Sequence, residues 1–408
     1  MKLSKRILAL ALAVVMAVSV FSFASCSSDN LDVPKFSDET IKIGLTGPLT
    51  GGAAVYGTAV RNSARLAVSE INAAGGLKVG DKNILFSLEM YDDKHDATQV
   101  ANLYSKLKSK GMQVSLGTVT TKPGLEFAKL SKDDNLFFIT PSATGDAIPA
   151  NSNGFQMCFA DSNQGIGAAL YFNEAFVGKT VGVFYKSDDE YSKGIYDNFK
   201  KYLNPIFNLD ANTATFQGED AIFSSQIEIL KDCDVVFMPI YYTPASQFMT
   251  QANSVQNSIS VYYGCDGFDG INAIEGFDIS TVKQEVSYLT HFTTNATEGP
   301  AKTFVDKYNE TFNTKKEPVN QFGASAYDCV YAIYEALKIA VANGKVVDGS
   351  TSASDMCNIL TEVFTSPSFV FRGITGKTVG NEKSVIAWNQ DGTVNKLATK
   401  EVVKEKTA

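Results

Sequence analysis

With 408 residues, 44% of them hydrophobic and 20% charged, the chain has the length and balance of a folded protein with two lobes rather than of a disordered or fibrous one. Acidic residues outnumber basic ones, 44 to 36, for a net charge of −8, which argues against a nucleic-acid binder because such proteins need a basic surface. The only two histidines, His95 and His291, leave little room for a His-ligated catalytic metal or a Ser-His hydrolase.

The first 25 residues have the pattern of a secretory signal. A start with three basic residues is followed by an apolar run from Ile7 to Val20 and by small residues before Cys26. The apolar run is long enough to span a bilayer, so a retained anchor helix is the alternative. A cysteine directly after Ala-Ser resembles the bacterial lipoprotein signal, in which the cysteine is lipidated and becomes the first mature residue. We therefore predict a signal peptide over residues 1–25 and a membrane anchor on Cys26, outside the cytoplasm.

Residues 26–40 are predicted to form a tether, because they are rich in Ser and Asp, contain Pro34 and lack apolar periodicity. Extended, they would reach about 45–50 Å. The body beyond them has five cysteines and no close-spaced pair, which predicts buried free thiols rather than a disulfide framework. These are Cys158, Cys233, Cys265, Cys329 and Cys357.

From Ile41 onward, β runs alternate with helical patterns. The first β run, 41–46, precedes a helix that starts near Gly57 and stops at Gly75-Gly76. Further strands are predicted at 84–90, 114–117 and 136–139, with helices at 97–110 and from about 123. Strands separated by helices of this length indicate parallel βαβ units in a doubly wound sheet.

The alternation starts again after Asp161. Strands are predicted at 181–185, 235–238 and 260–264, and helices at 193–202, 223–231 and 245–255. A β run at 286–292, long helices at 301–312 and 324–341, and short β runs at 369–372 and 384–388 complete the chain. Two successive series predict an α/β fold made of two doubly wound parallel-sheet lobes.

Ligands of open parallel sheets bind at the carboxyl ends of the strands. The loops expected there carry hydroxyl groups in the first series, and tyrosines with one carboxylate in the second. Thr121, two residues before Pro123, is predicted as the N-cap of a helix whose outward-facing N–H groups favour a carboxylate. Asp266 in the second series would hold an ammonium, so a small zwitterion would satisfy both.

Five short motifs follow one another along the body. They are IKIGLTGPLTG from Ile41, AVSEINAAGG from Ala67, ITPSAT from Ile139, DSNQG from Asp161 and FGASAYDCVY from Phe322. In this order and spacing, over a stretch that ends near Gly392, they resemble the leucine/isoleucine/valine-binding type of periplasmic substrate-binding protein. That family supplies the receptor subunit of branched-chain amino-acid ABC transporters.

The resemblance implies a type I periplasmic binding protein fold, in which the lobes are joined by a three-segment hinge near Ala160, Phe292 and Phe369. Lobe 1 would take 41–160 plus 292–368, and lobe 2 would take 161–291 plus 369–400. It also implies a protein without catalytic activity, cofactor or metal. A small-molecule ligand, an amino acid, would bind between the lobes, and ABC permease subunits in the membrane would be the partners.

The family's ligand contacts fall on eight residues. Its carboxylate-binding hydroxyl falls on Thr121, and the acidic residue that takes the amino group falls on Asp266, where Glu is typical of valine-type binders. The remaining positions are Ser142, Ala143 and Thr144 of the ITPSAT loop, the first-lobe aromatic Tyr56, and the second-lobe tyrosines Tyr191 and Tyr241 or Tyr242. The cysteine pair of some relatives is absent, because His95 and Thr120 occupy those positions.

Structural roles are the alternatives at each position. In the structural alternative, Thr121 serves only as a helix cap, and Asp266-Gly267 serves only as a turn. The tyrosines then only pack against other apolar side chains. The acidic run 92–96 lacks the spacing of a calcium loop, so we predict a strand-to-helix connection in which Asp96 caps the helix. Residues 373–378 are predicted as a turn rather than a phosphate loop.

The leading hypothesis is a lipid-anchored receptor that delivers a free amino acid, branched-chain or related, to an ABC importer. The alternative is a ligand-sensing protein that presents an amino acid or a small amide to a signalling partner. An exported hydrolase is disfavoured, because the sequence has neither a Gly-x-Ser-x-Gly elbow nor a His-Glu-x-x-His motif.

Overall fold

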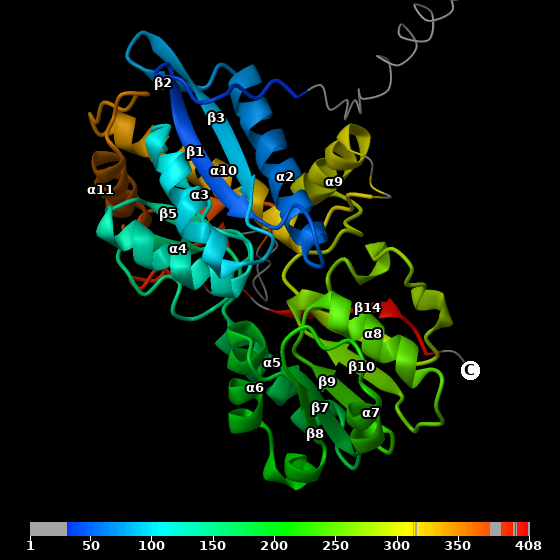
Figure 1. The fold of residues 1–408 in the computed structure, drawn as a ribbon. Helices are drawn as coiled ribbons and strands as arrows, with labels where there is room; N and C mark the ends of the chain where they lie inside the picture. Colours follow the sequence, from blue (N-terminus) through cyan, green and yellow to red (C-terminus); the bar gives the residue numbers. More distant parts are fainter. Residues whose placement is uncertain are drawn as a thin grey trace, which may run out of the picture. The chain divides into compact units, whose positions relative to one another are not determined.

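The structure, a computed structural model, describes residues 31–312, 314, 316–375, 385–394, 396 and 398–406. The predicted signal peptide and Cys26 lie outside these residues. Within them, the chain forms two sheets of six strands each and a two-stranded sheet (Figure 1). The two-stranded sheet pairs β12 (Phe371–Arg372) with β13 (Val385–Ile386).

The first large sheet has the order β2-β3-β1-β4-β5-β6. All neighbouring strands are parallel except β2, which pairs antiparallel with β3. In register, Ile43 lies between Leu88 and Val114. The strands are β1 (Thr40–Gly47), β2 (Leu77–Val79), β3 (Lys82–Asp92), β4 (Val114–Ser115), β5 (Phe138–Thr140) and β6 (Gly154–Gln156).

Helices cover both faces of this sheet, which explains why every residue of β1 is buried. Helices α2 (Ala54–Ala73), α10 (Gln321–Ala342) and α11 (Ala353–Phe364) contribute to one hydrophobic cluster. Helices α3 (Ala97–Ser109) and α4 (Thr121–Asp133) contribute to another. Helix α9 (Gly299–Thr311) packs beside α2.

The second large sheet has the order β14-β11-β10-β9-β7-β8, and only β14 is antiparallel to its neighbour. Helices α5 (Asp161–Ala175) and α6 (Glu190–Tyr202) pack on one face, and α7 (Ser224–Leu230) and α8 (Tyr242–Ala252) on the other. The strands are β7 (Val181–Lys186), β8 (Thr213–Phe216), β9 (Val235–Met238), β10 (Val261–Gly264), β11 (Glu285–Thr290) and β14 (Thr399–Lys404).

These topologies confirm the predicted α/β fold with two doubly wound sheets. Several elements differ from their predicted bounds: α4 begins at Thr121 rather than near 123, and α8 begins at Tyr242 rather than at 245. Helix α11 and strands β2, β6, β8 and β14 were not predicted. Strand β14 reads TKEVVK and none of its residues is fully buried, so its sequence alone carries little strand signal.

The C-terminal segment packs differently from the predicted division of the chain. The rings of Phe369 and Trp388 stack 5.8 Å apart, and both contact Phe364 of α11. The indole nitrogen of Trp388 donates to the carbonyl of Gln156 in β6 at 2.7 Å. Only at Thr399 does the chain join the second sheet. We therefore propose a third crossover after residue 394 in place of the one predicted near Phe369, with the other lobe bounds as predicted.

A buried carboxylate holds part of this segment. Asp328 of α10 accepts hydrogen bonds from the backbone N–H groups of Ile374 and Thr375, both at 2.9 Å, and from the Thr375 hydroxyl at 2.5 Å. The Lys396 ammonium donates to the same hydroxyl at 2.7 Å. Both charged side chains are buried. Burial raises the pKa of Asp328 and lowers the pKa of Lys396 to about 8.

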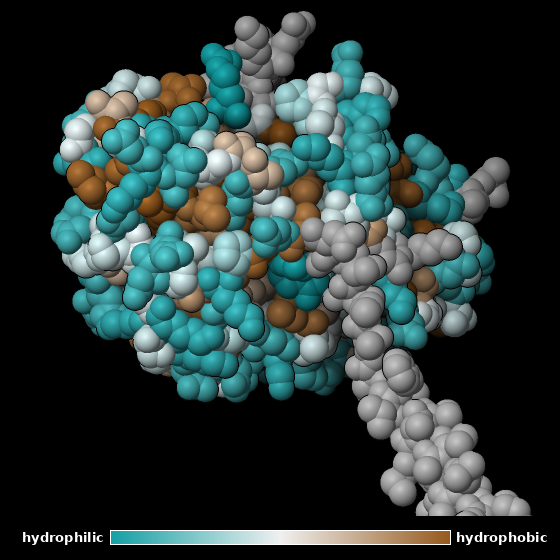
Figure 2. Space-filling model, turned by 90° about the horizontal axis from the view of Figure 1, so that it is seen from above, coloured by the Kyte–Doolittle hydropathy of each residue, from teal (hydrophilic) through white to brown (hydrophobic). Residues whose placement is uncertain are grey.

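The five cysteines named above are free and buried in the core, as predicted. Val33 and Phe36 of the predicted tether pack against the hydrophobic clusters. Figure 2 shows a face that is mostly hydrophilic, with smaller hydrophobic areas between the polar residues. Across the described ranges, no helix has both the length and the apolar character needed to cross a membrane.

Candidate functional site

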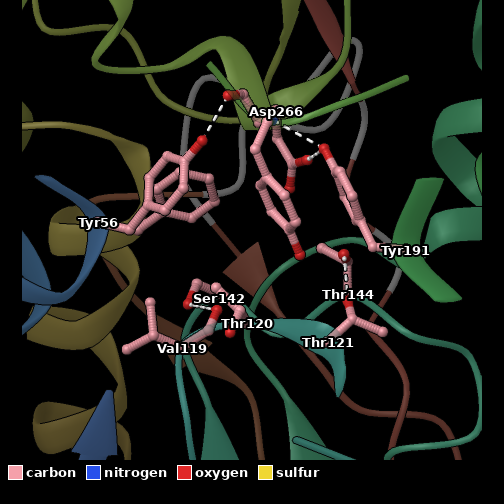
Figure 3. A pocket seen from close by; sticks show the side chains of 11 residues that line it. Tyr56, Val119, Thr120, Thr121, Ser142, Thr144, Tyr191 and Asp266 are labelled. Carbon is pink, nitrogen blue, oxygen red and sulfur yellow. Dashed lines mark hydrogen bonds between the residues drawn. The ribbon is translucent and has the colours of Figure 1, made fainter. Parts of the chain in front are cut away.

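Loops from the carboxyl ends of both large sheets line one small cavity, whose volume is about 10 Å³ (Figure 3). Seven of the eight predicted contact residues line it. In Figure 3 the hydroxyl side chains of Thr120, Ser142 and Thr144 lie on one side, and Asp266 lies on the opposite side. The complete lining is Tyr56, Val119, Thr120, Thr121, Ser142 and Thr144 from the first series, Phe322 from the start of α10, and Tyr191, Tyr241, Asp266 and Gly267 from the second series.

The hydroxyl side is built around the start of α4. Thr121 is the first residue of this helix, so the prediction that it forms the N-cap was wrong by one position, and Thr120 is the N-cap. The Thr121 and Thr144 hydroxyl oxygens lie 3.4 Å apart. Backbone N–H groups in the first turn have no partner within the helix, and together with the helix dipole they favour an anion beside these hydroxyls.

The ITPSAT loop keeps its shape through internal hydrogen bonds. The Thr140 hydroxyl donates to the Thr118 carbonyl at 3.0 Å and accepts from the Ala143 N–H at 2.9 Å, and the Ser142 hydroxyl donates to the Val119 carbonyl at 2.5 Å. Ala143, the eighth predicted residue, does not line the cavity. Its side chain is fully buried among the residues under α3 and α4, and its carbonyl accepts from Gln156 at 3.2 Å.

Asp266 provides the only carboxylate of the lining and is 1% exposed. One of its oxygens accepts from the Tyr191 hydroxyl at 2.6 Å, and its backbone N–H donates to Gln164 at 2.9 Å. Burial raises the pKa of Asp266 to about 7, against the lowering effects of Tyr191, Gln164 and the Gly267 N–H. The next position favours glycine, because a Cβ on Gly267 would lie 2.8 Å from the backbone carbonyl oxygen of Ile240 and 2.6 Å from the Tyr191 hydroxyl.

Aromatic side chains form the walls. The rings of Tyr191 and Tyr241 stack 4.5 Å apart, and Tyr56 lies edge-on to Phe322 at 5.1 Å. The Tyr56 hydroxyl, carried by α2, donates to the Gly267 carbonyl at 2.5 Å and so joins the two series of loops. Within the described part of the chain, the buried Tyr241 hydroxyl makes no hydrogen bond of good geometry, although the nearby Thr121 N–H opposes the rise that burial causes in the pKa of Tyr241.

Sequence reasoning missed four lining residues: Val119, Thr120, Gly267 and Phe322. Signals were present for three of them, since Val119 and Thr120 belong to the loop before α4 and Phe322 begins the fifth motif. The structure also resolves the choice between two tyrosines. Tyr241 lines the cavity, whereas the Tyr242 hydroxyl accepts from the N–H of Val55 at 3.2 Å.

The acidic run 92–96 connects strand β3 to helix α3, as predicted. Asp92 accepts from the N–H of Leu49 and from the Thr50 hydroxyl, at 2.8 and 2.6 Å. Asp96 is the N-cap of α3 and accepts from the Thr98 N–H at 2.9 Å, as predicted. Elsewhere among the residues that the structure describes, no group of three or more His, Cys, Asp or Glu side chains is placed to hold a metal ion.

The cavity thus has two chemically different ends. One end offers hydroxyl groups and a helix N-terminus, which suit a carboxylate. The other offers a buried carboxylate, which suits an ammonium. The walls between them are aromatic and aliphatic, and no basic side chain lines the cavity. Such an arrangement fits a small zwitterion with an apolar body.

Comparison with known proteins agrees with this geometry. The family model described as periplasmic binding protein matches residues 40–381. The Leu/Ile/Val-binding protein BraC3 of Rhizobium johnstonii is 26% identical over 85% of this chain and 91% of its own length. The Leu/Ile/Val-binding protein homolog 3 of Brucella melitensis is also 26% identical, over 84% and 94%.

A solved structure is similar over nearly the whole body. The branched-chain amino acid transporter substrate binding protein LivJ of Streptococcus pneumoniae, in complex with isoleucine, has a TM-score of 0.71 and 27% identity, covering 89% of this chain and 99% of its own. The structure of LivK from Thermotoga maritima, at 22% identity and the same TM-score, shares the fold. Because the family model spans most of its length, the chain belongs to the periplasmic binding protein family.

Proposed function

We propose that this protein is the substrate-binding component of an ABC importer and captures a free L-amino acid, branched-chain or related, outside the cytoplasm. The observation that carries the proposal is the placement of Asp266 and the N-terminus of α4 on opposite sides of one cavity that both large sheets line. The Leu/Ile/Val-binding relatives and the isoleucine complex of the similar structure support the same class of ligand.

In this proposal the amino acid lies across the cavity. Its carboxylate accepts from the hydroxyls of Thr121 and Thr144 and from the first turn of α4. Its ammonium pairs with Asp266, whose position is held by Tyr191. Ser142 supports the loop under the carboxylate, and the side chain packs against the aromatic walls. Because one ligand would touch loops of both lobes, its binding stabilises the closed arrangement, which a permease can then recognise.

We further propose that the protein is held at the membrane by lipid on Cys26, as a retained receptor for permease subunits embedded there. The lipoprotein-like signal supports this part of the proposal. The periplasmic binding protein family supports the location outside the cytoplasm.

Isothermal titration calorimetry of the purified body tests the function. L-leucine, L-isoleucine and L-valine should bind one to one, with at least one dissociation constant in the micromolar range, about −8 kcal/mol. The decarboxylated amine of the best ligand and its D-enantiomer are the matched controls and should bind at least tenfold more weakly. Absence of binding by every L-amino acid tested, or equal binding of the amine, would contradict the proposal.

Binding should depend on pH through Asp266. Burial holds the pKa of this carboxyl at about 7, and only its ionised form pairs with an ammonium. The affinity for L-isoleucine should therefore be constant above about pH 8 and fall about tenfold by pH 6, where most of the carboxyl is protonated in the free protein. Calorimetry across this range measures the slope. Asp161 is a second buried carboxyl with a raised pKa, so loss of the slope in Asp266→Asn assigns it to Asp266.

The Tyr241→Phe variant tests whether the Tyr241 hydroxyl contributes to ligand affinity rather than to the stability of the free protein. Among the described residues the buried Tyr241 hydroxyl makes no hydrogen bond of good geometry and has only the nearby Thr121 N–H as a neighbouring donor, so its removal should change the melting temperature of the free protein little. If the hydroxyl donates to the bound amino acid, affinity should fall about three- to tenfold. Thermal unfolding and calorimetry on the same sample check both parts. A lower melting temperature without any change in affinity would show that Tyr241 only packs.

A further inference from the structure

Helix α4 has an N-cap residue that does not cap it. Thr120 has the extended backbone of an N-cap, and threonine is among the residue types preferred there, yet its side chain makes no hydrogen bond to the helix. The third helical residue is Pro123, which lacks an N–H. The N–H of Lys122 is therefore the remaining target for a threonine at this position. This target lies in the turn to which we assign the carboxylate of the bound amino acid.

His95 explains why the cap is not made. Its ring nitrogen Nδ1 lies 2.8 Å from the Thr120 hydroxyl oxygen, so the Thr120 side chain is held toward the imidazole, in an orientation that makes no bond to the first turn of α4. The opposite lobe contributes as well, since the ring of Tyr241 packs edge-on against the imidazole at 5.1 Å. His95 thus contacts two residues that line the cavity without lining it itself.

Two consecutive residues with left-handed backbone conformation position the imidazole of His95. Lys94 and His95 both have left-handed conformations, with φ of 56° and 62°, which are uncommon for residues other than glycine. The His95 N–H donates to the buried Asp93 at 2.9 Å and fixes this turn. Burial, with the nearby charges of Lys186 and Lys122, lowers the pKa of His95 to about 4. The ring is therefore neutral at pH 7 and keeps the bond to Thr120 over the physiological range.

We propose that His95 is a positioning residue for carboxylate recognition: by holding the Thr120 side chain toward the imidazole, it keeps this residue from capping α4 and leaves the Lys122 N–H to the carboxylate of the bound amino acid. The inference rests on the proposed function, since it concerns the same ligand. A self-capped helix would bind the carboxylate less well, because the ligand would have to displace an internal hydrogen bond.

The test combines a substitution with its suppressor. His95→Asn tolerates the left-handed backbone and frees the Thr120 hydroxyl. It should weaken L-isoleucine binding about tenfold and leave the melting temperature of the free protein unchanged or higher, because α4 gains a cap. Adding Thr120→Val removes the N-cap hydroxyl and should restore most of the lost affinity. Lys94→Asn, at the neighbouring left-handed position, is the control and should bind within about twofold of the wild type.

A merely structural role for His95 would give a different pattern. A double variant as weak as His95→Asn, or His95→Asn that binds within about twofold of the wild type, would overturn the inference. If His95→Asn does not fold, hydrogen exchange of the wild type decides: L-isoleucine should slow exchange at the amides of Thr121 and Lys122 at least tenfold, and unchanged rates would overturn it. Failure of the wild type to bind any L-amino acid would instead refute the proposed function.

Discussion

Asp266→Asn is expected to weaken L-isoleucine binding ten- to a hundredfold, which is the largest effect that we expect from any single change in the cavity. The substitution keeps the size of the side chain and a hydrogen-bonding oxygen for Tyr191, but it removes the charge that pairs with the ligand ammonium. A hydrogen bond to a charged group contributes about 1.5–3 kcal/mol, and at this depth of burial water cannot replace it. Calorimetry at about pH 8, where Asp266 is ionised, gives the full effect.

The same variant should be more stable than the wild type in the free state. The pKa of Asp266 is raised in the folded protein to about 7, above its unfolded value of about 3.9. The folded state therefore loses stability as the pH rises between these two values, and an uncharged asparagine avoids that loss. Glu275→Gln, at an exposed acid in the following segment, makes the same change in net charge and should alter neither property. An Asp266→Asn protein that binds L-isoleucine as tightly as the wild type would remove this residue from the site.

Asp328→Ala is expected to lower the free energy of unfolding by about 3–5 kcal/mol. The change would leave the buried Lys396 ammonium without its compensating charge and two backbone N–H groups, those of Ile374 and Thr375, without their acceptor. Uncompensated buried charge and unpaired donors are among the few causes of losses this large. Denaturant unfolding followed by circular dichroism measures the effect.

The matched control for Asp328→Ala is the removal of a surface acid that forms a simple ion pair. Asp306 pairs with Lys302 on the exposed side of α9, and Asp306→Ala should change stability by less than about 1 kcal/mol. A loss of under about 1 kcal/mol in Asp328→Ala would mean that the Lys396 charge is compensated in another way. It would also weaken the proposal that residues 369–375 and 385–394 belong with the first sheet.

Much of the fold was predictable because most of the central strands are short apolar runs followed by a helical pattern, whereas the short buried strand β6, with the sequence GFQ, was missed. Strand β9, Val235–Met238, was predicted to the residue, since four buried apolar residues are bounded by acidic and proline-containing turns. Strand β14 could not be found in the same way. Its polar residues become a strand only through pairing with β11, which is a tertiary interaction.

Prediction of the site residues was limited in the same way, because some of their contacts are tertiary interactions. Residues at loop positions after strands were predicted well, because parallel topology brings those positions to one edge of each sheet. The N-cap of α4 was misplaced because two threonines precede Lys-Pro and either satisfies the local preference. The interaction that decides how the Thr120 hydroxyl is used comes from His95, 25 residues earlier, and no local pattern reveals it.

A crystal structure of the protein grown with L-isoleucine tests the central claim most directly. We expect the amino acid in the cavity between the two large sheets, with its carboxylate at Thr121 and the first turn of α4 and its ammonium within hydrogen-bond distance of Asp266. An isoleucine bound with these ends reversed, or bound on one lobe only and away from Asp266, would contradict it.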